Sequence, residues 1–261
     1  MDAAHNARSA ATTEWLEVAG NDMNPRITGI SSMATRQVLA ELADAFQQRS
    51  GCEVAIESVG GIDAAKRIQA GEPFDVVILA SDAIERLIAA GRVVGNRVDL
   101  VRSPVAIAVR AGAPRPDVSS EHALRRAVLA AHHISYSTGP SGVHLSRLFE
   151  RWGIAQEIKQ RIVQAPPGVP VGSLVARGDV ELGFQQLSEL MHLDGIHVLG
   201  TLPDEIEYIT LFSAGLCASS RQAAAVRTML DFMTSPETDE AKRRHGMEPA
   251  LDRDSRGDSL S

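Results

Sequence analysis

The chain alternates short apolar segments with amphipathic ones, and polar turns rich in glycine and serine separate them. An apolar segment ends near residue 28, a Gly-Ile-Ser-Ser turn follows at 29–32, and a helix is predicted up to Gly51, a residue typical of helix ends. The apolar positions of this helix recur at the spacing of one helical face, namely Val38, Leu39, Leu42 and Phe46. The pattern indicates a strand that runs through a turn into a helix.

The same unit returns twice before residue 92. A strand at 52–58 leads through Val59-Gly60-Gly61-Ile62 into a helix that stops at Gly71. A strand at 74–80 leads into a helix that Ser81 is expected to cap. This last strand is apolar nearly throughout, as strands of parallel sheets are. Three successive units predict a doubly wound α/β fold.

Two long apolar runs, 98–110 and 208–218, bracket a middle region that repeats the strand and helix signals. We expect both runs to cross between two lobes, with the second lobe inserted into the first and a ligand cleft between them. The predicted division is a disordered extension at 1–23, lobe 1 at 24–104 and 205–251, lobe 2 at 105–204, and a loose tail at 252–261.

The turns at the strand ends carry the candidate chemistry. In open α/β sheets these ends line the ligand crevice, and a helix that begins there presents free N–H groups and a positive dipole end. An ordinary capped helix explains any single turn, but the recurrence of three turns and a glutamine pair favours a binding site. Neutral donors of this kind suit a compact anion. The predicted ligand-binding residues are Ser31, Ser32, Gly60, Gly61, Thr138, Ser141, Gln185 and Gln186.

Composition and charge exclude several classes of function. The chain has 261 residues and a net charge of −7, which argues against nucleic-acid binding. No segment reaches the apolar length of a membrane-spanning helix, so no membrane insertion is expected. Cys52 and Cys217 lack metal-site spacing, and the glycine patterns of nucleotide loops are absent. We therefore expect neither a metal nor a cofactor.

Two further observations concern location and proton chemistry. Residues 1–22 lack the basic region, apolar core and cleavage site of a secretory signal, so the chain as written is expected in the cytoplasm. Met23, where the folded pattern begins, is an alternative start. His144 follows the turn at 138–142 and is the candidate proton carrier, with a structural or solvated histidine as the competing interpretation.

Several segments together resemble the molybdate-binding protein family of ABC transporters. The most specific is Ala65-Lys66-Arg67-Ile68-Gln69-Ala70-Gly71-Glu72-Pro73-Phe74-Asp75-Val76. Supporting segments are Ser31-Ser32, Pro140-Ser141-Gly142, Arg177-Gly178-Asp179, Leu230-Asp231-Phe232 and Ser235-Pro236-Glu237. The resemblance covers residues 25–249 and implies a type 2 periplasmic-binding fold with a small anion between two lobes. For an exported chain it also implies a periplasmic location and an ABC transporter permease as partner.

The sequence departs from that family at two anion contacts. The second turn, which usually carries serine, reads Val59-Gly60-Gly61-Ile62, and a place that often holds tyrosine reads Gln185-Gln186. The departures favour an organic di- or tricarboxylate over a tetrahedral oxyanion. A small branch similar to this family acts as aconitate isomerase, which shifts a double bond in a tricarboxylate. A carboxylate-binding protein, an isomerase of that kind, and a protein that keeps the fold but binds nothing stay open as alternatives.

Overall fold

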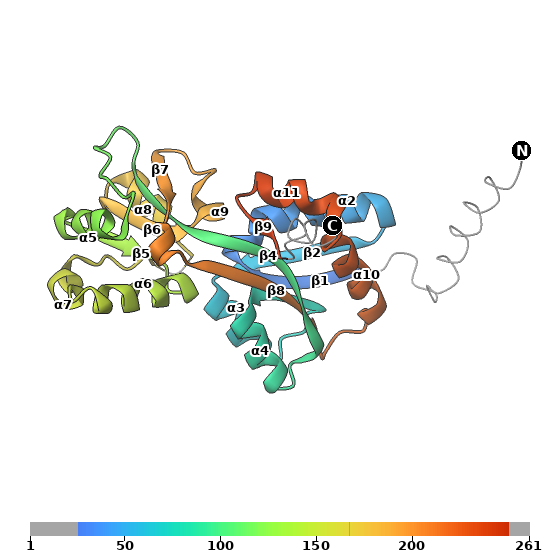
Figure 1. The fold of residues 1–261 in the computed structure, drawn as a ribbon. Coiled ribbons are helices and arrows are strands. Elements are labelled where there is room, and N and C mark those ends of the chain that lie inside the picture. The colour runs from blue at the N-terminus through green and yellow to red at the C-terminus, as the bar shows by residue number, and fades with distance from the viewer. Residues whose placement is uncertain (1–25, 167, 251–261) are drawn as a thin grey trace, which may run out of the picture.

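A computed structural model describes residues 26–166 and 168–250. The extension predicted at 1–23 and the tail predicted at 252–261 lie outside the described residues. Within those residues nine strands are paired in the order β2-β1-β3-β8-β4-β6-β5, and β7 and β9 also pair with β4. The strands form two sheets that share β4, one in each lobe (Figure 1).

The first sheet begins with the three parallel strands predicted from the apolar pattern, in the order β2-β1-β3. Ladder bonds join β1 to β2 and to β3, while β8 runs antiparallel to β3. The first part of β4 and the short β9 complete the sheet. The strands are β1 (Arg26–Ser32), β2 (Glu53–Val59), β3 (Val76–Ala80), β4 (Val93–Arg110), β8 (Ile209–Cys217) and β9 (Glu248–Pro249).

Helices cover both faces of the first sheet (Figure 1). One apolar core packs against the helices α2 (Arg36–Ser50), α10 (Ala223–Met233) and α11 (Asp239–Arg244). The other packs against α3 (Gly61–Gln69) and α4 (Ser81–Ala89). Gly51 ends α2 in the left-handed conformation with φ 72°, which confirms the predicted helix end.

The second sheet combines the rest of β4 with β5 (Ile134–Tyr136), β6 (Leu182–Gln186) and β7 (Ile196–Thr201). Its two faces also carry separate apolar cores. The covering helices are α5 (Glu121–Ala130), α6 (Pro140–Arg151) and α7 (Ala155–Ile158) on one face, and α8 (Val171–Arg177) and α9 (Leu187–Leu190) on the other. Short 3₁₀ turns are η1 (Met33–Thr35), η2 (Lys159–Arg161), η3 (Asp204–Ile206) and η4 (Pro236–Thr238).

Strand β4 is the connection between the two sheets. It pairs with β8 up to Pro104 and with β6 from Val105 onward. The α/β class and the two-lobed arrangement predicted from the sequence are therefore confirmed. The residue boundaries given for the lobes stay a prediction.

The second apolar run crosses between the lobes only at its start, where Tyr208 packs against the second-lobe core and Ile209 pairs with Pro104 in the first sheet. All of β8 pairs within the first sheet, and the returning connection is the segment 202–208 before it. Val105 bonds both ends of that segment, because its N–H donates to Tyr208 O at 3.2 Å and its carbonyl accepts from Leu202 N at 3.0 Å. The run at 208–218 is apolar because β8 lies between β3 and β4 in the sheet.

One local prediction needs correction. Ser81 does not cap α4 through its side chain, since Ala80 holds the cap position and Ser81 Oγ donates to Leu211 O at 2.8 Å. A partner distant in sequence therefore decides the orientation of this side chain.

Candidate functional site

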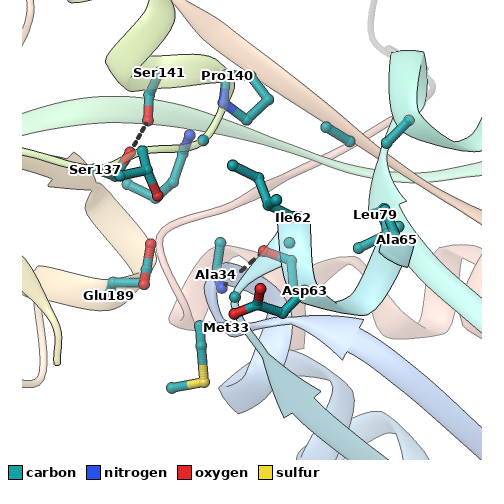
Figure 2. A pocket seen from close by; sticks show the side chains of 18 of the residues that line it. Met33, Ala34, Ile62, Asp63, Ala65, Leu79, Ser137, Pro140, Ser141 and Glu189 are labelled. Atoms are coloured by element: carbon teal, nitrogen blue, oxygen red, sulfur yellow. Dashed lines mark hydrogen bonds between the residues drawn. The ribbon is translucent and has the colours of Figure 1, made fainter. Parts of the chain in front are cut away.

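A cleft of about 770 Å³ lies between the two lobes, and the predicted strand-end turns line it. Figure 2 shows Ser137 and Glu189 on one side of this pocket and Met33, Ala34, Ile62 and Asp63 on the other. Seven of the eight predicted binding residues are brought together here: Ser32, Gly60, Gly61, Thr138, Ser141, Gln185 and Gln186. Ser31 is the exception.

The first-lobe wall of the cleft begins at the end of β1. Ser32 is the N-cap of η1, and its Oγ accepts from Ala34 N at 3.4 Å. Ser31 points to the opposite side of the strand, where it is fully buried and its Oγ lies 2.8 Å from Ser58 Oγ. Successive side chains of a strand alternate between faces, so only one of two adjacent serines reaches the cleft.

The first-lobe wall continues at the start of α3. Gly60 is the N-cap and provides no side-chain hydrogen bond, so the first N–H groups of the helix are free to meet a ligand. A Cβ added at Gly61 would come within 3.6 Å of Ser32 Oγ, which places the two turns side by side. The side chains of Ile62, which is 47% exposed, and Leu79 add an apolar surface.

The second-lobe wall begins at the turn from β5 into α6. Ser137 Oγ and Ser141 Oγ lie 2.8 Å apart, and the N-cap Gly139 provides no side-chain bond. A Cβ at Gly142 would lie 1.6 Å from Ser137 O, so only glycine allows the helix to begin this close to the turn. Sequence reasoning did not select Ser137, although it adjoins the predicted Thr138.

Gln185, at the end of β6, is held in one orientation. Its Oε1 accepts from Gly172 N at 3.1 Å, and its Nε2 donates to Glu189 Oε1 at 2.7 Å. Because a backbone N–H can only donate, the oxygen of the amide must face Gly172 and the NH₂ must face Glu189. Gln185 therefore acts on Glu189 as a fixed donor.

Gln186, the next residue, has one unsatisfied amide atom. Its Nε2 donates to Thr210 Oγ1 at 2.7 Å, while its buried Oε1 has no hydrogen-bond partner in the described residues. A half-turn of the amide exchanges the two atoms and would present an N–H in place of the oxygen. An anion in the cleft would select that second orientation, because it needs a donor.

Glu189 is a lining residue that the sequence prediction missed. It sits in the single turn α9, partly buried in the cleft wall. Burial raises the pKa of its carboxyl group to about 7, and the hydrogen bond from Gln185 offsets part of that rise. The sequence did contain one signal for this site, which is a glutamate four residues after a glutamine at the end of a predicted strand.

His144 does not line the cleft. Its ring stacks on Tyr208 with centroids 4.4 Å apart, and Nε2 is buried with no partner in the described ranges. Burial lowers the pKa of His144 below its ordinary value. This position gives the histidine no contact with a ligand in the cleft.

Within residues 26–166 and 168–250, no group of three His, Cys, Asp or Glu side chains is placed to hold a metal ion. No helix in the same ranges has the length and apolar content needed to span a membrane.

Comparison with known proteins relates this architecture to characterised chains. An aconitate isomerase from a Pseudomonas species is 37% identical over 232 residues, covering 85% of this chain and 87% of that protein. The periplasmic molybdate-binding protein of Azotobacter vinelandii superposes with a TM-score of 0.70 at 20% identity, covering 85% of this chain and 98% of that one. The sulfate-binding protein SubI of Mycobacterium tuberculosis gives 0.73 at 16% identity, covering 88% of both.

These structures confirm the type 2 periplasmic-binding fold that the sequence resemblance implied. The family model described as bacterial extracellular solute-binding protein matches residues 27–248. The chain belongs to the bacterial extracellular solute-binding proteins, in the group that resembles the molybdate-binding proteins.

Proposed function

We propose that the chain binds a small organic di- or tricarboxylate in the cleft between its lobes. The observation that carries this proposal is the meeting of two uncapped helix starts, those of α3 and α6, with apolar side chains in one pocket. The free N–H groups and dipole ends suit carboxylate oxygens. The apolar side chains suit a carbon skeleton, which a tetrahedral oxyanion lacks.

The polar groups of the cleft support the same choice. Gly60 and Gly61 offer backbone donors and room in place of serine hydroxyls, and Gln186 offers an amide in place of a phenol. Lys66 lines the cleft as an exposed cation that a carboxylate end can approach. The proposed contacts are Ser32, Gly60, Gly61, Thr138, Ser141, Gln185 and Gln186, while Ser31 supports the strand behind them.

A thermal-shift series followed by calorimetry tests the proposal. The anions are molybdate, tungstate, sulfate, succinate, citrate and the two aconitate isomers, with acetate and chloride as controls for unspecific ion effects. A ligand at 100 times its Kd adds about 2.7 kcal/mol to stability, so a true ligand gives a clear shift. Micromolar molybdate affinity without carboxylate binding contradicts the proposal, and no shift with any anion supports a fold that binds nothing.

A second candidate function is isomerisation of an unsaturated tricarboxylate in the same cleft. The observation that favours it is the aconitate isomerase relative, whose match at 37% identity spans most of both chains. Incubation of the purified chain with cis-aconitate, followed by chromatography, separates an enzyme from a binding protein. Conversion that scales with protein concentration supports the enzyme, and unchanged substrate supports the binding protein.

For the binding protein we propose an ABC transporter permease as the partner and a periplasmic location. The support is the family description, which is that of extracellular solute-binding proteins. Osmotic-shock fractionation of cells that express the full natural gene product tests the location. Recovery only with the cytoplasmic fraction contradicts this part of the proposal and fits the isomerase.

A further inference from the structure

We propose that Glu189 is the proton-carrying residue of this cleft, taking a proton from one end of an allylic system in a bound unsaturated polycarboxylate and returning it to the other end. The inference rests on the second candidate function above. The proton transfer is thereby assigned to Glu189, which lines the cleft, and no longer to His144, which does not.

Glu189 differs in position from the other titratable groups of the cleft. The titratable side chains that line the cleft in the described part of the chain are Asp63, Lys66, Arg86 and Glu189. Three of them are exposed side chains on α3 and α4, where water competes for any proton they hold. Glu189 alone is partly buried in the wall, and it faces the cleft from the second lobe (Figure 2).

The Glu189 carboxyl group is held in one orientation. Gln185 fixes Glu189 Oε1 as an acceptor through the 2.7 Å bond, and no protein group in the described residues bonds Oε2. A proton on this carboxyl group is therefore carried by Oε2. Ser188, the neighbour in α9, donates to Ala34 O at 2.8 Å and so ties this turn to the first-lobe wall. Glu189 is held at the junction of the two walls.

The charged and neutral forms of Glu189 are close in free energy. The pKa of about 7 leaves both forms populated near neutrality, which is the condition for efficient general acid–base catalysis. No ionised group of the described chain contributes to this pKa, so no ion pair locks one form. The main elements packed against α9 are η1, β4, β6 and β7, whose only titratable residues are Arg97, Asp99, Arg102, Arg110 and His197.

The reaction step balances without any other reactant. The Glu189 carboxylate removes a proton from the methylene carbon, and the electron pair of that C–H bond enters the adjacent double bond to give an allylic carbanion delocalised onto a carboxylate. The Glu189 carboxylic acid then gives the proton to the far carbon, where a new C–H bond forms. The double bond has moved by one position, and Glu189 is a carboxylate again.

The same walls can stabilise the negative charge that forms on the carbanion intermediate. The free N–H groups at the starts of α3 and α6 stabilise the enolate form of the intermediate, as donors of an oxyanion hole do. Gln186 can add an amide N–H after its half-turn. Gln185 is a positioning residue, since it acts through Glu189.

Glu189→Gln tests the inference with cis-aconitate as the probe. The full chain is followed by proton NMR in D₂O, which reports double-bond migration and deuterium uptake together, while calorimetry reports Kd. We expect kcat to fall by about a thousandfold with Kd within about threefold of the wild type. Glu189→Asp, which keeps the acid but shortens it, should recover part of the loss. Glu240→Gln, an exposed change away from the cleft, should behave as the wild type.

The outcomes separate this inference from the proposed function. Turnover of Glu189→Gln within tenfold of the wild type overturns it. A wild-type chain that binds cis-aconitate tightly but neither converts nor deuterates it also overturns it, and leaves carboxylate binding in place. A chain that binds no carboxylate overturns both. In the supporting case wild-type kcat/KM rises with pH through about 7, because the deprotonated form is the base.

Discussion

The two walls of the cleft are built differently. The first-lobe wall consists of Ser32, the glycine turn into α3 and the apolar side chains of Ile62 and Leu79, with the exposed side chains of Asp63, Lys66 and Arg86 around them. The second-lobe wall consists of the start of α6, which also lacks a side-chain cap, together with Ser137, Ser141, the two glutamines and Glu189. Ser137 bonds Ser141 and Gln185 bonds Glu189, while Gln186 bonds Thr210. Both walls offer unbonded N–H donors, but the second also contains a preassembled network of side chains.

This difference assigns different tasks to the walls. Backbone N–H donors cannot be titrated, so those at the start of α3 attract an anion at any pH. The second-lobe wall contains the carboxyl group of Glu189, whose pKa is raised to about 7, so the interaction of this wall with an anion depends on pH. A substitution in the first wall should change affinity alone, and one in the second should change proton chemistry or stability as well.

The strongest test of the comparison uses one glycine from each wall. Gly142→Ala places a Cβ 1.6 Å from Ser137 O and should destabilise the protein by about 3 kcal/mol. Gly61→Ala meets Ser32 Oγ at 3.6 Å and Leu79 Cδ2 at 3.9 Å, which are ordinary contacts, and should leave the melting temperature close to that of the wild type. Differential scanning calorimetry of both variants measures this. Equal losses of stability in the two variants would show that the two walls are equally rigid.

The second test uses the adjacent serines of the first wall. Ser32→Ala should weaken ligand binding by roughly ten- to a hundredfold, because a hydrogen bond to a charged group contributes about 1.5–3 kcal/mol. Ser31→Ala is the matched control, since Ser31 bonds Ser58 and does not line the cleft. Calorimetric titration with the ligand from the anion series measures both. A loss of affinity at Ser31 as large as at Ser32 contradicts the assignment.

The third test is the pH dependence of stability without ligand. The carboxyl group of Glu189 has a pKa of about 7 when folded and 4.5 when free, so the folded state keeps a proton that the unfolded state has released. Its contribution to stability is therefore largest at low pH and is lost as the pH rises from about 4.5 to about 7.

Glu189→Gln removes this dependence of the folding stability on pH, because an amide does not titrate. The melting temperature of the variant should exceed that of the wild type by a few degrees at pH 8 and by less at pH 5. Melting curves at pH 5, 6, 7 and 8 measure the difference, with Glu240→Gln as the control for loss of one carboxylate. If the melting temperatures of wild type and Glu189→Gln change in parallel with pH, this carboxyl group is ionised in both the folded and the unfolded protein from pH 5 to pH 8.

The smallest expected effect is at Gln186. Gln186→Ala removes the buried bond to Thr210, which should cost about 1 kcal/mol of stability. If the amide also turns toward the ligand, affinity falls by about tenfold. Thermal melts and titrations measure the two effects separately. Unchanged affinity with a lowered melting temperature would make Gln186 a structural residue between β6 and β8.

The sequence was informative where the signal is local. A strand that ends in a glycine or hydroxyl turn before an amphipathic helix can be identified from neighbouring residues, and this located Ser32, Gly60, Thr138 and Ser141 at one cleft. The fold followed from the repetition of that unit. The two long apolar runs predicted two lobes, and the resemblance to a known family added the type of periplasmic-binding fold.

The sequence was less informative where distant packing decides. Ser31 and Ser32 both resemble caps, and the pairing of β1 with β2 determines that Ser31 is buried against Ser58 while Ser32 faces the cleft. Glu189 resembles a surface glutamate of a short helix, because its burial depends on strands that come from elsewhere in the chain. His144 had the suitable chemistry, but its stacking on Tyr208 holds it away from the cleft.

The placement of β1 and β9 in one sheet has a mechanical consequence. Both ends of the described chain, Arg26 and Ala250, leave from the first lobe, and the second lobe is attached through β4 and the segment 202–208. Tension applied to the two ends therefore passes through the first sheet, and the second lobe carries no load until that sheet ruptures. Under force the first-lobe wall of the cleft is lost before the hydrogen-bonded network of the second.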